Sequence, residues 1–229
     1  MRRCRYKYYL KTVPGIEDEF RAIIMIMKNY NWKYTQVVYS TDAYNEDDVS
    51  LFRRLAAQAG ICVVASYSFD SSYRMDMLSQ QSAVRPVLLL LSPDNHRNFL
   101  AALNATNVRS KNDFIATSTF SSSSNITSRY EFIAEGFISI DIMYSDLTQF
   151  YNELATRRVI TYQDNPWFEE WFEELFDCYV GDNPQGFTAP CNTASSITNA
   201  PGFKRDLKVM HVINAVYAIA YGLRSVLAE

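Results

Sequence analysis

The sequence predicts an α/β fold in which parallel strands form a sheet flanked by helices. Residues 61–66 and 86–91 are almost continuously apolar, as strands covered on both faces are. Segments with apolar residues at helical spacing alternate with these runs. Because the connections between them are short, the pattern favours a doubly wound sheet joined by right-handed crossovers.

The first predicted elements are a helix, a strand and a second helix. Apolar residues recur at helical spacing over 20–27, and this helix is expected to end near Tyr30. Residues 33–39 are predicted as a strand that runs into a polar turn. Asn45 can cap the next helix, and Gly60 suits the left-handed position just past its end.

Further strands and helices follow in alternation. Residues 71–81 favour a helix, and Asp94 can cap another one. Residues 113–117 are predicted as a strand, 118–130 as a polar loop and 136–142 as a further strand. The loop would open onto the edge of the sheet where the strands end.

Helical segments dominate after residue 147. Residues 165–178 have aromatic and leucine side chains on one face and four glutamates on the other, with Pro166 suited to the first helical position. No histidine lies near the glutamates, so they match a solvated face better than a metal or acid-base site. The last helix is expected over 203–228. Its core-facing residues would be Leu207, Met210, Ile213, Tyr217, Ala220 and Leu223.

Composition argues against several functional classes. The net charge of -3 leaves no basic excess to neutralise nucleic-acid phosphates. The longest clean apolar runs, 23–27 and 87–91, are far shorter than the roughly 18 residues of a membrane-spanning helix. The basic start, 1–11, lacks the apolar core of a signal peptide. We therefore expect no signal peptide and no transmembrane segment within this chain.

Motifs for nucleotide binding and hydrolysis are absent from the sequence. There is no phosphate loop, no Gly-x-Gly-x-x-Gly turn and no Gly-x-Ser-x-Gly elbow. Only two histidines occur, and neither is placed to complete a catalytic triad or a metal shell. We expect a protein that is not an enzyme and that holds neither a metal nor another cofactor.

The four cysteines do not form a zinc motif, since none belongs to a Cys-x-x-Cys pair. Cys178 and Cys191 flank a loop rich in glycine, proline and asparagine, which a disulfide could close. Asn104 and Asn125 begin Asn-x-Thr sequons and are candidate glycosylation sites.

The candidate binding site is the edge where the strands end, because ligands of open α/β sheets bind there. Ser40, Thr41 and Tyr44 follow the predicted strand over 33–39. The ring of Tyr44 has two interpretations: it packs over the turn, or it forms the wall of a ligand cleft.

Several blocks of sequence together resemble one receptor family. The chain is similar to the extracellular ligand-binding domain of metabotropic glutamate receptors, which are class C G-protein-coupled receptors. Each block is modest alone, but they keep the family's order and approximate spacing along nearly the whole chain. The blocks are residues 6–14, 28–32, 55–62, 165–178 and 212–223.

The resemblance implies a fold with two lobes, the Venus flytrap of periplasmic-binding proteins. Residues 12–135 would form most of lobe two, and 136–229 would return to lobe one. Residues 1–11 would be the tail of an earlier lobe-one segment that the chain does not contain. The resemblance therefore implies an incomplete bilobed domain.

The resemblance also carries over site residues one by one. Tyr44 matches the family's cleft tyrosine, whereas Ile16 and Ser118 stand where the family has aspartates. The aspartate at the Ser118 position pairs with the ligand's ammonium group in the family. A neutral hydroxyl cannot replace that charge-assisted bond, which is about twice as strong as a neutral one.

The cysteines fit the family as well. Cys178 and Cys191 match a disulfide within lobe one. Cys62 matches the cysteine that links lobe two to a stalk, and it should be a free thiol here. Cys4 has no counterpart.

The resemblance implies a receptor that binds glutamate or a related amino acid between its lobes and signals by lobe closure. The intact family forms homodimers on the extracellular face of the plasma membrane and reaches a G protein through a membrane domain. Because one lobe is incomplete, we expect weak or no binding by this chain alone, and a bare apolar surface. Two alternatives stay open: a small flavodoxin-like α/β enzyme, and another flytrap receptor or solute-binding protein.

Overall fold

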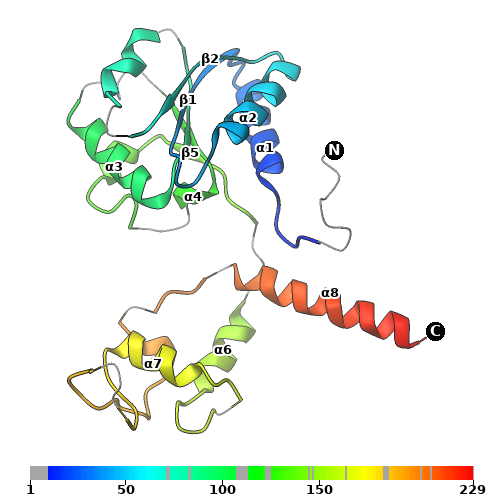
Figure 1. Cartoon of the computed structure of the whole chain (residues 1–229), viewed down its shortest axis with the longest axis vertical. Coiled ribbons are helices and arrows are strands. Elements are labelled where there is room, and N and C mark those ends of the chain that lie inside the picture. The colour runs from blue at the N-terminus through cyan, green and yellow to red at the C-terminus, as the bar shows by residue number, and fades with distance from the viewer. Residues whose placement is uncertain are drawn as a thin grey trace. The chain divides into compact units, whose positions relative to one another are not determined.

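The structure is a computed structural model that divides the chain into two compact units (Figure 1). The sheet unit is Val13–Ile142, and the helical unit contains residues 10–12 and 143–228. The assignment of these units to the lobes of a flytrap stays a prediction. The described residues are 10–70, 73–81, 84–106, 113–121, 125–143, 145, 147–162, 164–182, 186–201, 203–206 and 208–228.

Five parallel strands form the sheet, and the α/β fold class is confirmed. The strand order is β2-β1-β3-β4-β5. The chain therefore moves from β1 to one side of the sheet and from β3 to the other. The strands are β1 (Tyr34–Tyr39), β2 (Cys62–Ser68), β3 (Val87–Leu90), β4 (Phe114–Ala116) and β5 (Ile138–Ser139).

Helices cover both faces of the sheet. Alternate side chains of the central strands point to opposite faces, so Val37 and Leu88 pack with α1 and α2, whereas Val38 and Leu89 pack with η1 and α3. The helices of this unit are α1 (Ile16–Asn29), α2 (Glu46–Gln58), η1 (Met75–Gln81), α3 (Pro93–Asn104), α4 (Ser118–Ser121) and α5 (Glu131–Ala134).

The start of α2 follows the predicted capping chemistry. The Asn45 side chain accepts a hydrogen bond from the Asp48 backbone, and the Asp48 carboxylate accepts one from the Asn45 backbone. Gly60 has the expected positive φ just past the helix. For α3 the predicted cap, Asp94, is wrong. Ser92 caps this helix by accepting from the Asn95 backbone, because Pro93 takes the first helical position.

Several predicted elements differ in extent or type. β2 is partly exposed rather than covered on both faces, because it is an edge strand. The helix predicted over 71–81 is the 3₁₀ helix η1, and residues 71–72 lie outside the described residues. Residues 118–130 are not only loop, since α4 begins directly at Ser118. The strand predicted over 136–142 shortens to the two residues of β5 at the other edge.

The helical unit packs around a small apolar core and a disulfide. Phe168, Phe172 and Ile197 are buried in this core. Cys178 and Cys191 are bonded, with their Cα atoms 4.9 Å apart. The elements are α6 (Thr148–Thr156), α7 (Phe168–Phe176), η3 (Ile197–Asn199) and α8 (Val209–Leu227).

α7 is amphipathic, but three details of its prediction are wrong. Pro166 precedes the helix, because Trp167 occupies the N-cap position. Trp167 is 70% exposed, so the apolar stripe is narrower than expected. Glu173 is buried rather than solvated, since its carboxylate accepts a hydrogen bond from the backbone of Val180.

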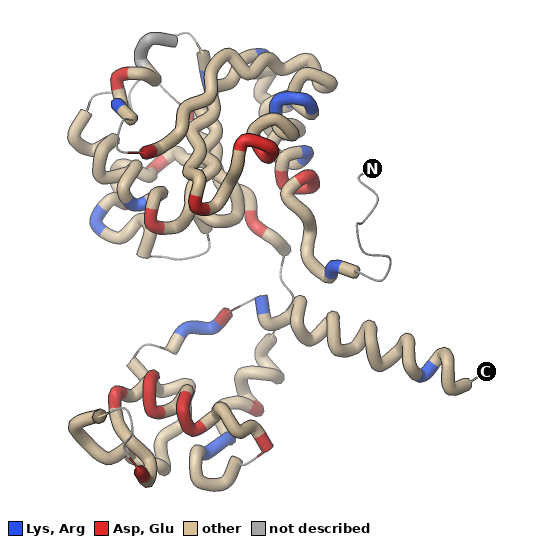
Figure 2. The backbone as a smooth tube through the Cα atoms, in the orientation of Figure 1, with Lys and Arg blue, Asp and Glu red and all other residues tan. Residues whose placement is uncertain are grey.

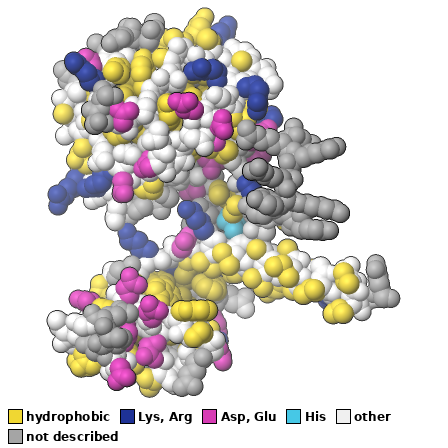
Figure 3. All heavy atoms as spheres, viewed as in Figure 1, with side chains coloured by type: hydrophobic (Ala, Val, Ile, Leu, Met, Phe, Trp, Pro, Cys, Tyr) yellow, Lys and Arg dark blue, Asp and Glu magenta, His cyan; other side chains and the backbone are white. Residues whose placement is uncertain are grey.

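α8 begins at Val209, later than the predicted start at residue 203, and lies largely in solvent. Tyr217, Ala220 and Leu223, expected in the core, are exposed, and Leu207 lies outside the described residues. Figure 3 shows hydrophobic side chains along this helix. The exposed apolar residues are Val212, Val216, Tyr217, Ile219, Tyr221, Leu223, Val226 and Leu227.

By length and composition alone, α8 could cross a membrane, and it is the one such helix in the described part of the chain. A single helix of this kind is weak evidence, because some helices of soluble proteins have the same length and composition. The expected absence of a transmembrane segment therefore stays a prediction.

Candidate ligand-binding edge of the sheet

The loops after β1 and β3 meet where the strand order reverses. The backbone N–H of Ser40 donates to the Leu90 carbonyl at 2.9 Å, and the N–H of Ser92 donates to the Ser40 hydroxyl at 3.0 Å. Ser40 is buried, whereas Thr41 beside it is exposed. In open α/β sheets, ligands bind beyond the strand ends at such a reversal.

An acidic side chain lies beside this crossing. Asp42 accepts a hydrogen bond from the Asn95 side-chain amide at 3.0 Å. Partial burial raises the pKa of the Asp42 carboxyl, but hydrogen bonds from Ser40, Ser92 and Asn95 outweigh it and hold the pKa below its ordinary value. Asp42 is therefore negatively charged at neutral pH.

Tyr44 begins a chain of hydroxyl groups along the edge. Its hydroxyl lies 2.7 Å from the Thr117 hydroxyl, which lies 2.9 Å from that of Thr119. Thr119 donates to the Leu91 carbonyl at 2.9 Å. Because a carbonyl only accepts, each hydroxyl donates to the next, and Tyr44 is the donor to Thr117.

The Tyr44 ring packs in the apolar core on the side of α1 and α2 and is 6% exposed. Burial raises the pKa of its hydroxyl, and the nearby charge of Glu19 raises it further. The structure thus shows the packed ring, and contact with a ligand stays a prediction.

Ser118 follows Thr117 and reaches a different partner. Its hydroxyl donates to the Glu19 carboxylate of α1 at 2.7 Å. Both side chains are partly exposed. A segment near the start of the chain and the loop after β4 therefore meet at the same edge.

Negative charge gathers at this edge. α1 and α2 both begin there, and each has three acidic residues in its first turn, seen as red segments in Figure 2. Their positive N-terminal dipoles stabilise these carboxylates. Among the described residues, no group of histidine, cysteine, aspartate and glutamate side chains could hold a metal ion.

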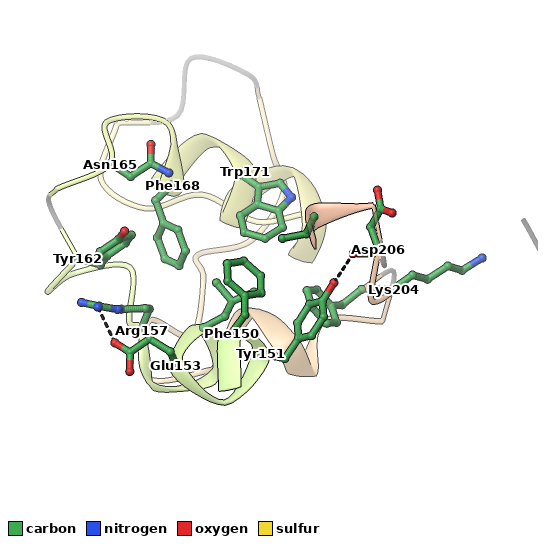
Figure 4. A pocket seen from close by; sticks show the side chains of 13 residues that line it. Phe150, Tyr151, Glu153, Arg157, Tyr162, Asn165, Phe168, Trp171, Lys204 and Asp206 are labelled. Atoms are coloured by element: carbon green, nitrogen blue, oxygen red, sulfur yellow. Dashed lines mark hydrogen bonds and ion pairs between the residues drawn. The ribbon is translucent and has the colours of Figure 1, made fainter. Parts of the chain in front are cut away.

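The helical unit has a separate pocket of about 400 Å³ between α6, α7 and the segment before α8 (Figure 4). Phe150, Phe168 and Trp171 turn their rings into it. Arg157 at its rim pairs with Glu153 and lies over a tyrosine ring. This lining suits an apolar or aromatic group.

Comparison with known proteins identifies the family. The model of a family described as the receptor family ligand-binding region matches residues 2–229. The chain belongs to this family. The metabotropic glutamate receptor of Drosophila melanogaster is 24% identical over 249 aligned positions, which cover 97% of this chain and 25% of the receptor. The chain thus spans about a quarter of that relative's length.

Membership of this family indicates a ligand-binding region of a receptor. Its ligand-binding regions are extracellular in receptors and are generally not enzymes, and this chain is similar to those of class C G-protein-coupled receptors. The glutamate in the relative's name describes that receptor and does not by itself assign a ligand to this chain.

The structure brings Ser40, Tyr44 and Ser118 to one edge, with Thr41 beside them. Asn104 and Asn125, the candidate glycosylation sites, are exposed. Cys62 is a free, exposed cysteine, and Cys4 lies outside the described residues.

Several residues of the candidate ligand-binding edge were not predicted from the sequence. Ser92 follows a buried strand just as Ser40 does, so the same argument could have found it. Thr117 stands at the end of a predicted strand, but the strand pattern does not show which side chain its hydroxyl contacts. Glu19 carries no signal of its own, because its contact with Ser118 spans 99 positions in sequence.

Proposed function

We propose that this receptor ligand-binding region binds glutamate or a related amino acid at the carboxyl edge of the sheet unit. The observation that carries the proposal is the polar network at that edge, where Tyr44, Thr117 and Thr119 form a hydroxyl chain and Ser118 meets Glu19. Small ligands bind in crevices with a few convergent polar groups, and this edge has such groups where the strand order reverses.

The ligand would bridge two lobes and favour their closed state. Residues 12–135 would supply one lobe and 136–229 part of the other. A ligand shifts such an equilibrium only by contacts that are stronger in the closed state. Closure would then reorient a homodimer on the extracellular side of the plasma membrane and signal to a G protein.

Binding by the chain alone should be weak. The polar groups of the site all come from the sheet unit, so a ligand would gain contacts from one side only. Affinity depends on how much of the ligand's surface is enclosed, and ligand pockets usually enclose about 70–90% of it. We expect dissociation constants in the millimolar range, about 4 kcal/mol of binding free energy.

A titration of the 229-residue chain with L-glutamate, followed by two-dimensional nuclear magnetic resonance, tests the proposal. Saturable shifts should cluster at the residues that follow β1 and β4. Tyr44→Phe removes only the hydroxyl that donates to Thr117 and should weaken binding about fivefold, the effect of roughly 1 kcal/mol. Tyr34→Phe, at the opposite end of β1, is the matched control and should change nothing.

Two results would contradict this proposal. If L-glutamate and other amino acids give no saturable shifts, the edge is not an amino-acid site. If calorimetry shows tight, stoichiometric binding of glutamate, the expectation of weak binding by one lobe is wrong.

A further inference from the structure

An α-amino acid carries an ammonium group at neutral pH, and a partly desolvated cation needs a negative charge beside it. Two carboxylates stand out among the described residues that border the hydrogen-bonded edge: Asp42, after β1, and Glu19, on α1. They differ in how far their oxygen atoms are already used.

The carboxylate of Asp42 already accepts a hydrogen bond within the protein. The side-chain amide of Asn95 donates to its carboxylate at 3.0 Å, and the hydroxyls of Ser40 and Ser92 also stabilise its charge. A ligand ammonium would have to compete with these donors. Asp42 is therefore the weaker candidate for recognising a cation.

Glu19 has more acceptor capacity left. Its one hydrogen bond in the described part of the structure comes from the Ser118 hydroxyl. An ionised carboxylate has about four lone-pair sites, so most of them remain for a ligand. Glu17, in the same helical turn, is instead paired with Arg21 at 2.7 Å, and no described cation forms such a pair with Glu19.

Glu19 also has the right neighbours. The hydroxyl chain that begins at Tyr44 passes through Thr117. Ser118 is the next residue in the sequence, and its hydroxyl donates to Glu19. The charge of Glu19, like that of Asp48, raises the pKa of the Tyr44 hydroxyl, beyond the larger effect of burial. A ligand lying along the hydroxyl chain would thus place its ammonium group near this carboxylate.

We propose that Glu19 supplies the negative charge that selects an ammonium-bearing ligand at this edge, and that Ser118 holds its carboxylate in position. This inference rests on the proposed amino-acid site. The ligand's N–H groups would donate to Glu19 while the Ser118 hydroxyl keeps its own bond. The neutral residue at position 118 is then compatible with amino-acid binding, because the charge comes from α1 rather than from the loop after β4.

The test compares L-glutamate with glutarate, which has the same two carboxylates and no ammonium group. Both are titrated into the full chain and followed by nuclear magnetic resonance. The native chain should prefer L-glutamate. Glu19→Gln, which keeps the shape and removes the charge, should reduce that preference about tenfold, as for a partly exposed charge-assisted bond. Glu17→Gln is the matched control and should keep the preference.

A rescue variant separates charge from shape. Glu19→Gln combined with Ser118→Asp moves the carboxylate to the neighbouring position, where the glutamine amide can donate to it. The preference for L-glutamate should return in this double variant. The spectra of all variants must keep the native peak dispersion, which shows that each one is folded.

Three outcomes would overturn the assignment. Glu19→Gln could keep the preference, or Asp42→Asn could remove it instead. The native chain could bind L-glutamate and glutarate equally, which leaves the proposed binding edge standing without a role for Glu19. If neither compound gives saturable shifts, both the binding edge and the role of Glu19 fail.

Discussion

His96 lies in the first turn of α3, with its ring buried against Phe120. Its Nδ1 atom lies 3.0 Å from the Ser92 carbonyl, so Nδ1 carries the proton and donates. Its Nε2 atom is buried and has no hydrogen-bond partner among the described residues. Burial lowers the pKa of His96 from 6.5 to about 4, and the hydrogen bond to Ser92 only partly opposes this.

This pKa makes stability depend on pH. The unfolded chain binds the His96 proton below pH 6.5, whereas the folded chain does not bind it until about pH 4. The stabilising contribution is complete above pH 6.5 and is lost as the pH falls toward 4, by about 3 kcal/mol in total. Urea unfolding at a series of pH values should show this loss in the native chain. In His96→Leu the loss of stability between pH 6.5 and 4 should be smaller by about 3 kcal/mol. If the free energy of unfolding falls equally with pH in both chains, this role of His96 is refuted.

Other single residues show how far sequence reasoning reached into the site. Ser40, Tyr44 and Ser118 could be predicted at one edge, because the ends of parallel strands meet there. Their partners could not be predicted. Whether a hydroxyl meets Thr117 or Glu19 depends on side-chain positions that the strand and helix pattern does not specify.

At the scale of elements, α7 and the disulfide that follows it form one structural block. Cys178 lies just after the end of α7, and its partner is 13 positions further along the chain. Glu173 binds the backbone of Val180 within the same loop. The disulfide therefore holds a loop whose own secondary structure in the described residues is little more than one isolated bridge.

Removal of this disulfide should destabilise the helical unit. Replacing Cys178 and Cys191 with alanine opens a loop whose ends are 13 positions apart, and the loss of a disulfide that closes a loop of this size costs roughly 3 kcal/mol. The free energy of unfolding, measured by denaturant titration, should fall by that amount. Cys62→Ala provides the control, since this exposed cysteine is unpaired and should contribute almost nothing. Equal stability of the double variant and the native chain would show that the disulfide is dispensable.

At the scale of the whole molecule, α8 is notable because its apolar side chains are largely exposed. A helix with apolar residues all around is usually buried in a core or a membrane. α8 has this composition, yet most of its side chains are exposed. An apolar surface of this kind favours association with itself or with a partner.

We expect the chain to self-associate through α8. Replacing Val212, Val216 and Ile219 with serine should weaken association at least about tenfold, because each loses apolar area that a contact would bury. Sedimentation across a range of concentrations measures this change. Met25→Ser is the control, since Met25 is 70% exposed but lies on α1 in the other unit. A native chain that stays monomeric at every concentration would contradict the prediction.

The sequence by itself determined the α/β class, the parallel strands of the sheet unit and the polar edge at their ends. It could do so because apolar runs and helix caps act locally, as Asn45 and Gly60 show. Only the tertiary structure decided that Glu19 meets Ser118, that Glu173 is buried and that α8 is bare. The physical reason is that each of these depends on which distant segments pack against a residue, and a helical or strand pattern shows only which side chains share a face.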